Sequence, residues 1–282
     1  MKILVLGASG MAGHTIALYF QERGNYVVGF STTPFNFCKN IIGNAYEFEV
    51  LRKILVKEKF DAVINCIGIL NQSAEDNRSN AIYLNSYLPH LIADSIKGTT
   101  TRLIHMSTDC VFAGNTGPYS ENSTPDGRTF YDRSKALGEV VDDKNLTFRN
   151  SIIGPDMKVH GIGLFNWFMK QKGEIKGYKK AIWTGVTTLT LAKAMESALE
   201  NNLTGLYNLV NNQPISKYDL IQLFNKHFRD RSINILEENN FVLDKTLINN
   251  RIDFPFIVPS YEQMIVEMKE WIDSHKVLYP FY

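Results

Sequence analysis

The N-terminal segment is a short apolar run that leads directly into three regularly spaced glycines. Residues 3 to 6 read Ile-Leu-Val-Leu, the run GASGMAG follows, and an amphipathic segment continues to about residue 23. Strand, glycine turn and helix in this order begin a Rossmann-type unit, because glycine permits the tight turn and the close packing of helix on strand. The helix N-terminus then offers free N–H groups to a phosphate. We predict dinucleotide contacts at Gly7, Ser9, Gly10, Met11 and Gly13.

The rest of the first half repeats this alternation of strand and helix. Further strand-like apolar runs occupy 26–30, 62–66 and 103–106, and helical patterns occupy 11–23, 48–58 and 80–97. Alternating βαβ units predict a parallel sheet with helices on both faces, and continuous apolar strands are typical of strands buried on both sides. The predicted fold class is therefore α/β, with a Rossmann-type doubly wound parallel sheet.

The second half is less regular. Helices are predicted at 161–172, 189–200, 216–228 and 261–273, with a short strand at 206–210. We predict an NADP-binding Rossmann domain with the catalytic residues at 1–154. Residues 155–282 would mainly form a smaller C-terminal substrate-binding cap, with segments that return to the Rossmann domain. Residues 113–130 are rich in Gly, Pro, Ser, Thr and Asn, which predicts a loop over the site.

Charge and cysteine content limit the classes of partner. The 282 residues include 30 Lys and Arg against 29 Asp and Glu, so the formal net charge of +1 gives no electrostatic reason to expect nucleic acid or an anionic membrane surface. Three cysteines without a CxxC pair suggest neither a disulfide framework nor zinc, and the six histidines show no metal-ligand spacing. From this spacing we expect no metal. No apolar run approaches a membrane span or a signal peptide, so we expect a soluble cytoplasmic protein.

The end of the second predicted strand bears on the type of dinucleotide. It reads Gly-Phe-Ser-Thr-Thr at 29–33, without the Asp or Glu that usually grips the ribose 2′-hydroxyl of NAD. An end without acidic residues leaves room for a 2′-phosphate, so Ser31 and Thr32 are predicted contacts and NADPH is the preferred cofactor. Lys39 is the candidate counter-charge.

A tyrosine and a lysine at helical spacing provide candidate chemistry. Tyr131 and Lys135 are four residues apart at the start of a helical pattern, so both lie on one helix face. A lysine near a phenol stabilises the phenolate and would lower the pKa of Tyr131 toward neutrality. Thr108 follows a buried strand in the run MSTDCVF, where its hydroxyl would polarise a substrate carbonyl.

Three consecutive runs resemble one known family. STDCVFAG, GPYSEN and YDRSKALGE are similar to the corresponding runs of dTDP-4-dehydrorhamnose reductases and related nucleotide-sugar reductases, which are extended short-chain dehydrogenases/reductases. WTGVTTLTLAKA and GLYNLV are similar to the family's C-terminal region. The resemblance implies that Thr108, Tyr131 and Lys135 are catalytic and that Asp109 contacts the sugar. It also implies that Asn85 is structural and that the cofactor is lined by Asn65, Cys66, Ile67 and Gly68.

Two positions depart from the family pattern. Asn44 stands where the family usually has an aspartate near the adenine, and Cys110 stands where a tyrosine commonly touches the substrate. Both departures concern selectivity for cofactor or sugar rather than the chemistry. Cys110 is retained as a predicted substrate contact beside Asp109.

The resemblance implies NADPH-dependent reduction of the 4-keto group of a nucleotide-linked 6-deoxysugar, carried by dTDP or UDP, for cell-surface polysaccharide biosynthesis. It also implies a homodimer. An epimerase or dehydratase on the same scaffold is one alternative, although Cys110 replaces the glutamate that dehydratases carry after the aspartate. A non-catalytic regulatory subunit, as in methionine adenosyltransferase, is the other.

Arg149 is predicted either to bridge the fold or to reach the substrate. Phe165, Trp167 and Phe168 are predicted to be helix core, with base stacking as the second interpretation.

Overall fold

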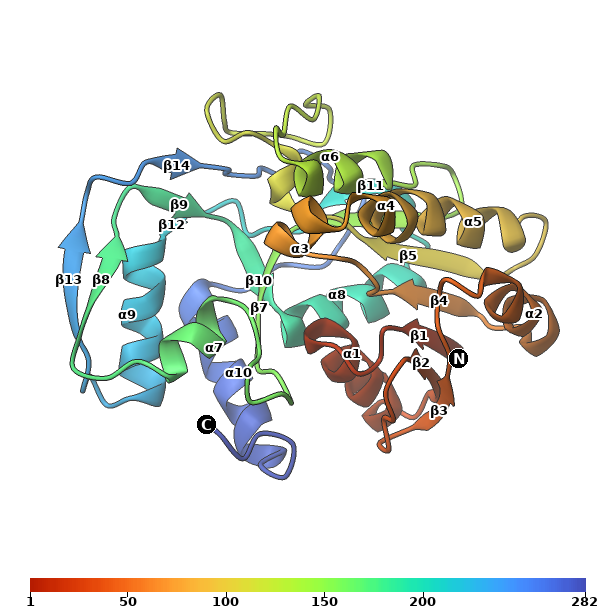
Figure 1. Ribbon diagram of the computed structural model, residues 1–282, viewed down its shortest axis with the longest axis horizontal. Helices are drawn as coiled ribbons and strands as arrows, with labels where there is room; N and C mark the ends of the chain where they lie inside the picture. Colours follow the sequence, from red (N-terminus) through yellow and green to blue (C-terminus); the bar gives the residue numbers. More distant parts are fainter.

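A parallel seven-stranded sheet forms the centre of the protein in a computed structural model that describes residues 1–282 (Figure 1). In spatial order its strands are β11 (Gly205–Asn208), β6 (Leu146–Arg149), β5 (Arg102–Met106), β4 (Ala62–Asn65), β1 (Lys2–Leu6), β2 (Tyr26–Ser31) and β3 (Lys39–Ile42). The strand order reverses between β1 and β4, and in such sheets ligands bind in the crevice outside the carboxyl ends at the reversal. The predicted α/β Rossmann-type sheet is confirmed.

Helices cover both faces of the sheet. They are α1 (Met11–Glu22), α2 (Phe48–Glu58), α3 (Asn71–Asp76), α4 (Arg78–Ala81), a π-helical turn η1 (Ile82–Tyr87), α5 (Leu88–Ser95), a 3₁₀ turn η2 (Asp109–Val111), α6 (Phe130–Leu137) and α8 (Thr188–Glu200). Figure 1 shows α1 and α8 on one face, where they pack together, and α4, α5 and α6 on the other.

Strand β1 shows why its apolar run is continuous. Ile3 and Val5 point into the core cluster that contains the buried residues of α1 and α8. Leu4 and Leu6 point into a second cluster with the buried residues of α2 and α5. Alternate side chains of a strand face opposite sides of a sheet, so a strand covered on both faces needs apolar residues at every position.

The remaining elements form a smaller region at one end of the sheet, seen at the left of Figure 1. They are β7 (Ser151–Ile153), α7 (Leu164–Met169), β8 (Glu174–Tyr178), β9 (Ala181–Trp183), β10 (Gly185–Thr187), β12 (Ile215–Ser216), α9 (Lys217–Phe228), β13 (Asn234–Glu238), β14 (Leu243–Asp244) and α10 (Tyr261–Ser274). Strand β11 and helix α8 belong to the main sheet region although they come late in the sequence. The division at residue 154 into a Rossmann domain and a cap stays a prediction.

Two predicted helices differ from the observed ones. The segment predicted at 80–97 is a series of short helices that begins at Asn71, with a π-helical turn in its middle. The helix predicted at 161–172 is only Leu164–Met169. Gly163 precedes it with φ +99°, a backbone conformation that no helix continues, so the glycines of this segment belong to a loop.

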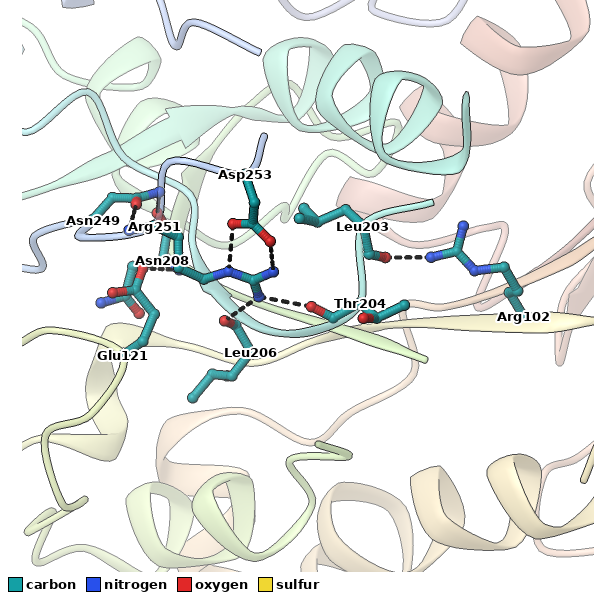
Figure 2. A network of polar contacts seen from close by, with 9 residues as sticks. All are labelled: Arg102, Glu121, Leu203, Thr204, Leu206, Asn208, Asn249, Arg251 and Asp253. Atoms are coloured by element: carbon teal, nitrogen blue, oxygen red, sulfur yellow. Dashed lines mark hydrogen bonds and ion pairs between the residues drawn. The ribbon is translucent and has the colours of Figure 1, made fainter. Parts of the chain in front are cut away.

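Strand β11 pairs with β6 on one side, and its outer edge is contacted by side chains rather than by a further strand (Figure 2). Nη1 of Arg251 donates hydrogen bonds to the carbonyls of Thr204 at 2.7 Å and Leu206 at 2.9 Å, and the same guanidinium is paired with Asp253. Glu121 accepts hydrogen bonds from the backbone N–H of Asn208 at 3.0 Å and of Asn250 at 3.2 Å. The free edge is therefore satisfied internally, which removes a template for pairing with another chain.

None of the helices is both long enough and apolar enough to cross a membrane.

Candidate active site

Two adjoining cavities open at the carboxyl ends of the strands. The inner cavity measures about 580 Å³ and reaches from the glycine turn to α6 and β7. The outer cavity measures about 320 Å³ and lies between the glycine turn and the end of β2. Five residues line both cavities and mark their junction: Gly10, Cys66, Ile67, Gly68 and Lys158. The cleft therefore has the place and the continuity that a dinucleotide needs at a switch point.

The glycine turn is closed tightly by backbone contacts. Gly7 has φ +79°, and a Cβ at Gly13 would lie 2.1 Å from the carbonyl oxygen of Gly7. Gly7, Ser9, Gly10 and Met11 line one or both cavities, whereas Gly13 lines neither and serves to pack α1 on the turn. With no large side chain on the turn, a pyrophosphate could approach the backbone at the start of α1. The residues present thus fit the predicted dinucleotide.

The outer cavity contains Ser31 and Thr32, as predicted, together with Asn44. No carboxylate lines it, and Lys158 is its one cationic side chain. The Ser31 hydroxyl donates to the Thr33 carbonyl at 2.6 Å.

The prediction for Lys39 is wrong. Its ammonium lies 5.9 Å from the ring centre of Tyr26. Lys39 begins β3 and is opposite Val28 of β2, so it lies away from the carboxyl end of β2.

The loop after β4 contributes to both cavities. Cys66, Ile67 and Gly68 line them, but Asn65 is fully buried beneath, where its Oδ1 accepts from the Ile67 N–H at 3.1 Å. Asn85 holds the next part of the loop, because its amide exchanges hydrogen bonds with the backbone of Ile69 and donates to Ser134 Oγ at 3.0 Å. Asn65 and Asn85 therefore shape the cavity without lining it.

Helix α6 positions Tyr131 and Lys135 at the inner cavity. A capping box starts the helix: Thr129 Oγ1 accepts from the Asp132 N–H, and the Asp132 carboxylate accepts from the Thr129 N–H, both at 3.1 Å. The carboxylate of Glu75 from α3 accepts from the N–H groups of Phe130 at 2.6 Å and Tyr131 at 3.2 Å. Free N–H groups at a helix start need such acceptors, so these contacts fix the orientation of the first turn. Nothing in the sequence singled out Glu75.

The electrostatics around Tyr131 differ from the prediction. Burial raises the pKa of Tyr131, Cys110 adds to the rise, and the neighbouring Thr108 hydroxyl opposes it. Burial lowers the pKa of Lys135 to about 8, against the opposing effects of Glu139 and Cys66. The Lys135 ammonium donates to the Met106 carbonyl at 2.6 Å, so its charge is directed at the end of β5. The expected lowering of the Tyr131 pKa by Lys135 is absent from this arrangement.

Thr108 and Asp109 line the inner cavity at the end of β5. The Thr108 hydroxyl donates to Asp109 Oδ1 at 3.0 Å, and the Ser151 hydroxyl donates to the same oxygen at 2.7 Å. Cys110 also lines the cavity, and burial, followed by the nearby Asp109 charge, raises the pKa of its thiol to about 12. The predicted catalytic and substrate residues are therefore brought together around one cavity.

Arg149 bridges the fold. It is 1% exposed, and its guanidinium pairs with Glu139 through bonds of 2.9 and 2.6 Å. Glu139 also accepts from the Ser107 hydroxyl at 2.6 Å, and the Arg149 guanidinium lies 4.9 Å from the ring centre of Phe112. Arg149 does not line the cavity, so of its two predicted roles the structural one is observed.

The polar segment 113–130 is wrongly predicted as a loop over the site. No residue of it lines either cavity. Tyr119 forms a β-bridge with Leu247, and its hydroxyl accepts from the N–H groups of Gly114 and Thr116 at 3.1 Å each. Glu121 accepts from β11, as described above. The tyrosine and glutamate of GPYSEN thus hold this segment on the C-terminal chain, away from the cleft.

Two of the three aromatic residues of α7 are core, as predicted, and the core prediction is wrong for Trp167. Phe165 and Phe168 are fully buried against Phe224, while Trp167 remains 42% exposed. Among the histidines, burial lowers the pKa of His14 to about 4, and that of His105 also falls well below its usual value. No three His, Cys, Asp or Glu side chains are arranged to hold a metal ion.

Sequence reasoning missed several residues that line the inner cavity. Asn150 and Ser151 follow β6, and the loop 154–163 contributes Asp156, Lys158, His160 and Gly161. The glycines of this loop were the available signal, but two of the three, Gly161 and Gly163, were assigned to a cap helix.

Comparisons with known proteins identify the family of the chain. The sequence profile of the RmlD substrate binding domain matches residues 1–242. The spore coat polysaccharide biosynthesis protein SpsK of Bacillus subtilis is 26% identical over 77% of this chain and 76% of its own length. The probable low-salt glycan biosynthesis reductase Agl14 of Haloferax volcanii is 33% identical over 51% and 50%. The methionine adenosyltransferase 2 subunit beta of Xenopus laevis is 27% identical over 49% and 41%. The chain thus spans half or less of the length of the latter two relatives.

Solved structures show the same fold at low identity. The dTDP-4-dehydrorhamnose reductase of Bacillus anthracis, in complex with NADP, has a TM-score of 0.81 at 17% identity and covers 96% of this chain and 99% of its own. The Bordetella bronchiseptica enzyme WbmG, in complex with NAD, has a TM-score of 0.78 at 15% identity over 100% and 96%. The profile match over residues 1–242 shows that the chain belongs to the RmlD substrate-binding-domain family.

Proposed function

We propose that the protein is an NADPH-dependent reductase of the 4-keto group of a nucleotide-linked 6-deoxysugar. The observation that carries the proposal is the inner cavity, in which Thr108, Tyr131 and Lys135 face a space that continues along the glycine turn. The names of SpsK and Agl14, a polysaccharide biosynthesis protein and a glycan biosynthesis reductase, support a role in making a sugar for such polymers. The cytoplasm stays the predicted location.

The protonation states suit a reductase. When bound, the dinucleotide supplies the hydride. Tyr131 remains a neutral phenol because burial raises its pKa, so it can give a proton to the oxygen of a reduced carbonyl. In this structure the Thr108 hydroxyl donates to Asp109, and it also lies close enough to Tyr131 to oppose the rise of that phenol's pKa. A hydroxyl rotates about its C–O bond, so a substrate oxygen bound beside Tyr131 can receive the Thr108 proton. We assign the proton transfer to Tyr131, the hydrogen bond that polarises the substrate carbonyl to Thr108, and the positioning of Asp109 to Ser151.

Lys135 contributes charge rather than a proton. Its ammonium is held by the Met106 carbonyl at the wall of the cavity. In the resembling enzymes the corresponding lysine contacts the nicotinamide ribose, and the position of Lys135 between α6 and β5 is compatible with that role. A positive charge there also stabilises the negative charge that develops on the carbonyl oxygen of the substrate during reduction.

Cys110 separates reduction from dehydration. Dehydration needs a second acid or base beside the catalytic group, and the thiol here stays neutral because its pKa is raised to about 12. An epimerase would also retain its dinucleotide through a full cycle of oxidation and reduction. We therefore expect the purified protein to carry no tightly bound dinucleotide.

A non-catalytic regulatory role is the second candidate, favoured by the similarity to the beta subunit of methionine adenosyltransferase. The presence of all three catalytic residues around one cavity favours the enzyme.

The test measures how many NADPH molecules are oxidised for each keto sugar that is consumed. Purified protein is incubated with NADPH and with the 4-keto-6-deoxy derivative of dTDP-glucose or of UDP-N-acetylglucosamine, and products are identified by mass spectrometry and NMR. We expect one NADPH oxidised per keto sugar consumed. Formation of an epimer or a 4-keto product from a 4-hydroxy sugar nucleotide, without net oxidation of NADPH, would refute the reductase.

A further inference from the structure

We propose that Lys158, carried on the loop 154–163, binds the diphosphate of the bound dinucleotide. The inference rests on the proposed function, since it assumes a dinucleotide in the cleft. It assigns a phosphate contact to a residue outside the glycine turn, on the loop between β7 and α7.

The position of Lys158 is the first observation. Lys158 lines both cavities, and it shares that property with Gly10 of the glycine turn and with residues 66–68. A dinucleotide that extends through both cavities crosses their junction with its diphosphate, because the glycine turn and the start of α1 lie there. Lys158 therefore lines the same junction as the glycine turn, where the diphosphate is expected.

The charges at the junction are the second observation. The outer cavity is lined by no other cation and by no carboxylate. The inner cavity has Lys135, but that ammonium donates to the Met106 carbonyl. Lys158 is exposed and has no carboxylate within ion-pair distance, although Asp156 is two residues away. An unpaired ammonium beside a site for two negative charges is free to make a charge-assisted hydrogen bond.

The construction of the loop is the third observation. Asn166 Nδ2 donates to the carbonyls of Gly154 at 3.1 Å and Ile162 at 2.7 Å, so one side chain ties the two ends of the loop together. The Tyr282 hydroxyl accepts from the Asp156 N–H at 2.9 Å and donates to Asn166 Oδ1. Asp156 Oδ1 in turn accepts from the Lys158 N–H at 3.0 Å. The backbone around Lys158 is thus held in place before any ligand binds.

The same loop end lies against α1. The Asn166 amide nitrogen is 3.8 Å from Met11 Sδ, and a Cβ on Gly163 would lie 3.6 Å from the same sulfur. Met11 is the first residue of α1. The C-terminal end of the loop therefore contacts the first residue of the helix that follows the glycine turn.

The test compares binding of three probes by calorimetric titration: NADPH, NADH and dTDP. In Lys158→Gln we expect the dissociation constants for NADPH and NADH to rise by a similar factor, about tenfold or more, because both share the diphosphate. The dissociation constant for dTDP should stay unchanged. Lys172→Gln is the matched control, since Lys172 is an exposed lysine that lines neither cavity, and it should bind all three probes as the native protein does.

Other outcomes have distinct meanings. Weaker binding of NADPH alone would place Lys158 at the 2′-phosphate and overturn the inference, and so would weaker binding of dTDP alone or no change at all. If the native protein binds neither dinucleotide, both the inference and the proposed function fail. If it binds them but reduces no keto sugar, only the proposed function fails.

Tyr282→Phe tests the positioning of the loop. It removes the hydroxyl that holds Asp156 and Asn166, and we expect a smaller loss of affinity for both dinucleotides than in Lys158→Gln. The loss should disappear when Lys158→Gln is already present, because the two changes act on one contact. A full loss from Tyr282→Phe in the Lys158→Gln background would show that Tyr282 acts on binding by another route.

Discussion

The inner and outer cavities differ in the kind of atoms that line them. The inner cavity gathers buried titratable side chains, among them Tyr131, Lys135 and Cys110, whose pKa values are all shifted by burial. The outer cavity is lined by glycines, small hydroxyl side chains and one lysine. Shifted pKa values mark candidate chemistry, whereas exposed backbone at a helix start marks phosphate recognition. Substitutions in the two cavities should therefore change different measured quantities.

The largest effect is expected from Tyr131→Phe in the inner cavity. Loss of the proton donor should reduce turnover by about 10² to 10⁴, the usual contribution of a general acid. The dissociation constant for NADPH should change little, because the phenol oxygen is the only atom removed. Rates come from NADPH absorbance and affinity from calorimetry. A variant that keeps most of its turnover would mean that another group delivers the proton.

Gly13→Ala should weaken dinucleotide binding at the glycine turn, which borders the outer cavity. The new Cβ would lie 2.1 Å from the Gly7 carbonyl oxygen, so the turn or α1 must shift. Overpacking of this kind lowers the free energy of unfolding by about 1–3 kcal/mol. We expect NADPH affinity to fall by about tenfold or more, measured beside thermal unfolding.

Gly24→Ala is the control at the other end of α1. Its φ of +78° makes alanine strained, but nothing lies within 4 Å of the new Cβ. It should lower stability without changing the affinity for NADPH. Equal losses of affinity in both variants would show that Gly13 acts through global stability alone.

Ser31→Asp tests the choice of dinucleotide. Ser31 lines the outer cavity, where no carboxylate is present. A new carboxylate would repel a 2′-phosphate, and about tenfold less preference for NADPH over NADH corresponds to about 1.4 kcal/mol. Competition binding with both dinucleotides provides the ratio. Native protein that prefers NADH by a similar factor would contradict the assignment of NADPH.

The smallest change in turnover is expected from Glu139→Gln, as a shift in pH dependence. This variant also leaves the buried Arg149 guanidinium without its carboxylate partner, so its unfolding is measured beside the rates. The pKa of Lys135 is about 8, and Glu139 raises it against the effect of burial. If the ammonium form is the active one, turnover falls as the pH rises through that pKa. Without the Glu139 charge the pKa drops, so the decline should begin at lower pH. Rates measured from pH 6 to 10 locate it, and an unchanged profile would show that Lys135 does not control it.

Lys135 should also make the free energy of unfolding depend on pH, and this free energy should rise over the pH range in which turnover falls. The Lys135 pKa lies below its usual 10.5, so between about pH 8 and 10.5 the unfolded chain binds the proton that the folded chain has lost. The contribution of Lys135 to the free energy of unfolding therefore increases with pH over that range. Denaturant unfolding of the native protein and of Lys135→Met separates this contribution from those of other groups.

Local patterns predicted the elements of the fold with good accuracy where one rule governs them. Hydrophobic periodicity and the turn residues between segments are enough to predict the glycine turn, helices α1 and α2 and the strand before Thr108. The segment 71–95 was harder because its helices are short and interrupted by a π-helical turn around Asn85. That turn is stabilised by hydrogen bonds to Ile69 and Ser134, which lie 16 and 49 positions away.

For the site, the sequence by itself determined which residues could do chemistry, because the spacing of Tyr131 and Lys135 on one helix and the place of Thr108 after a strand are local properties. Only the tertiary structure decided their charge states, since burial and the neighbours of Lys135 and Tyr131 come from separate elements. It also decided that Arg149 pairs with Glu139 and that Lys158 reaches the junction of the cavities. Such contacts depend on how distant segments pack, and no local pattern of residues records that packing.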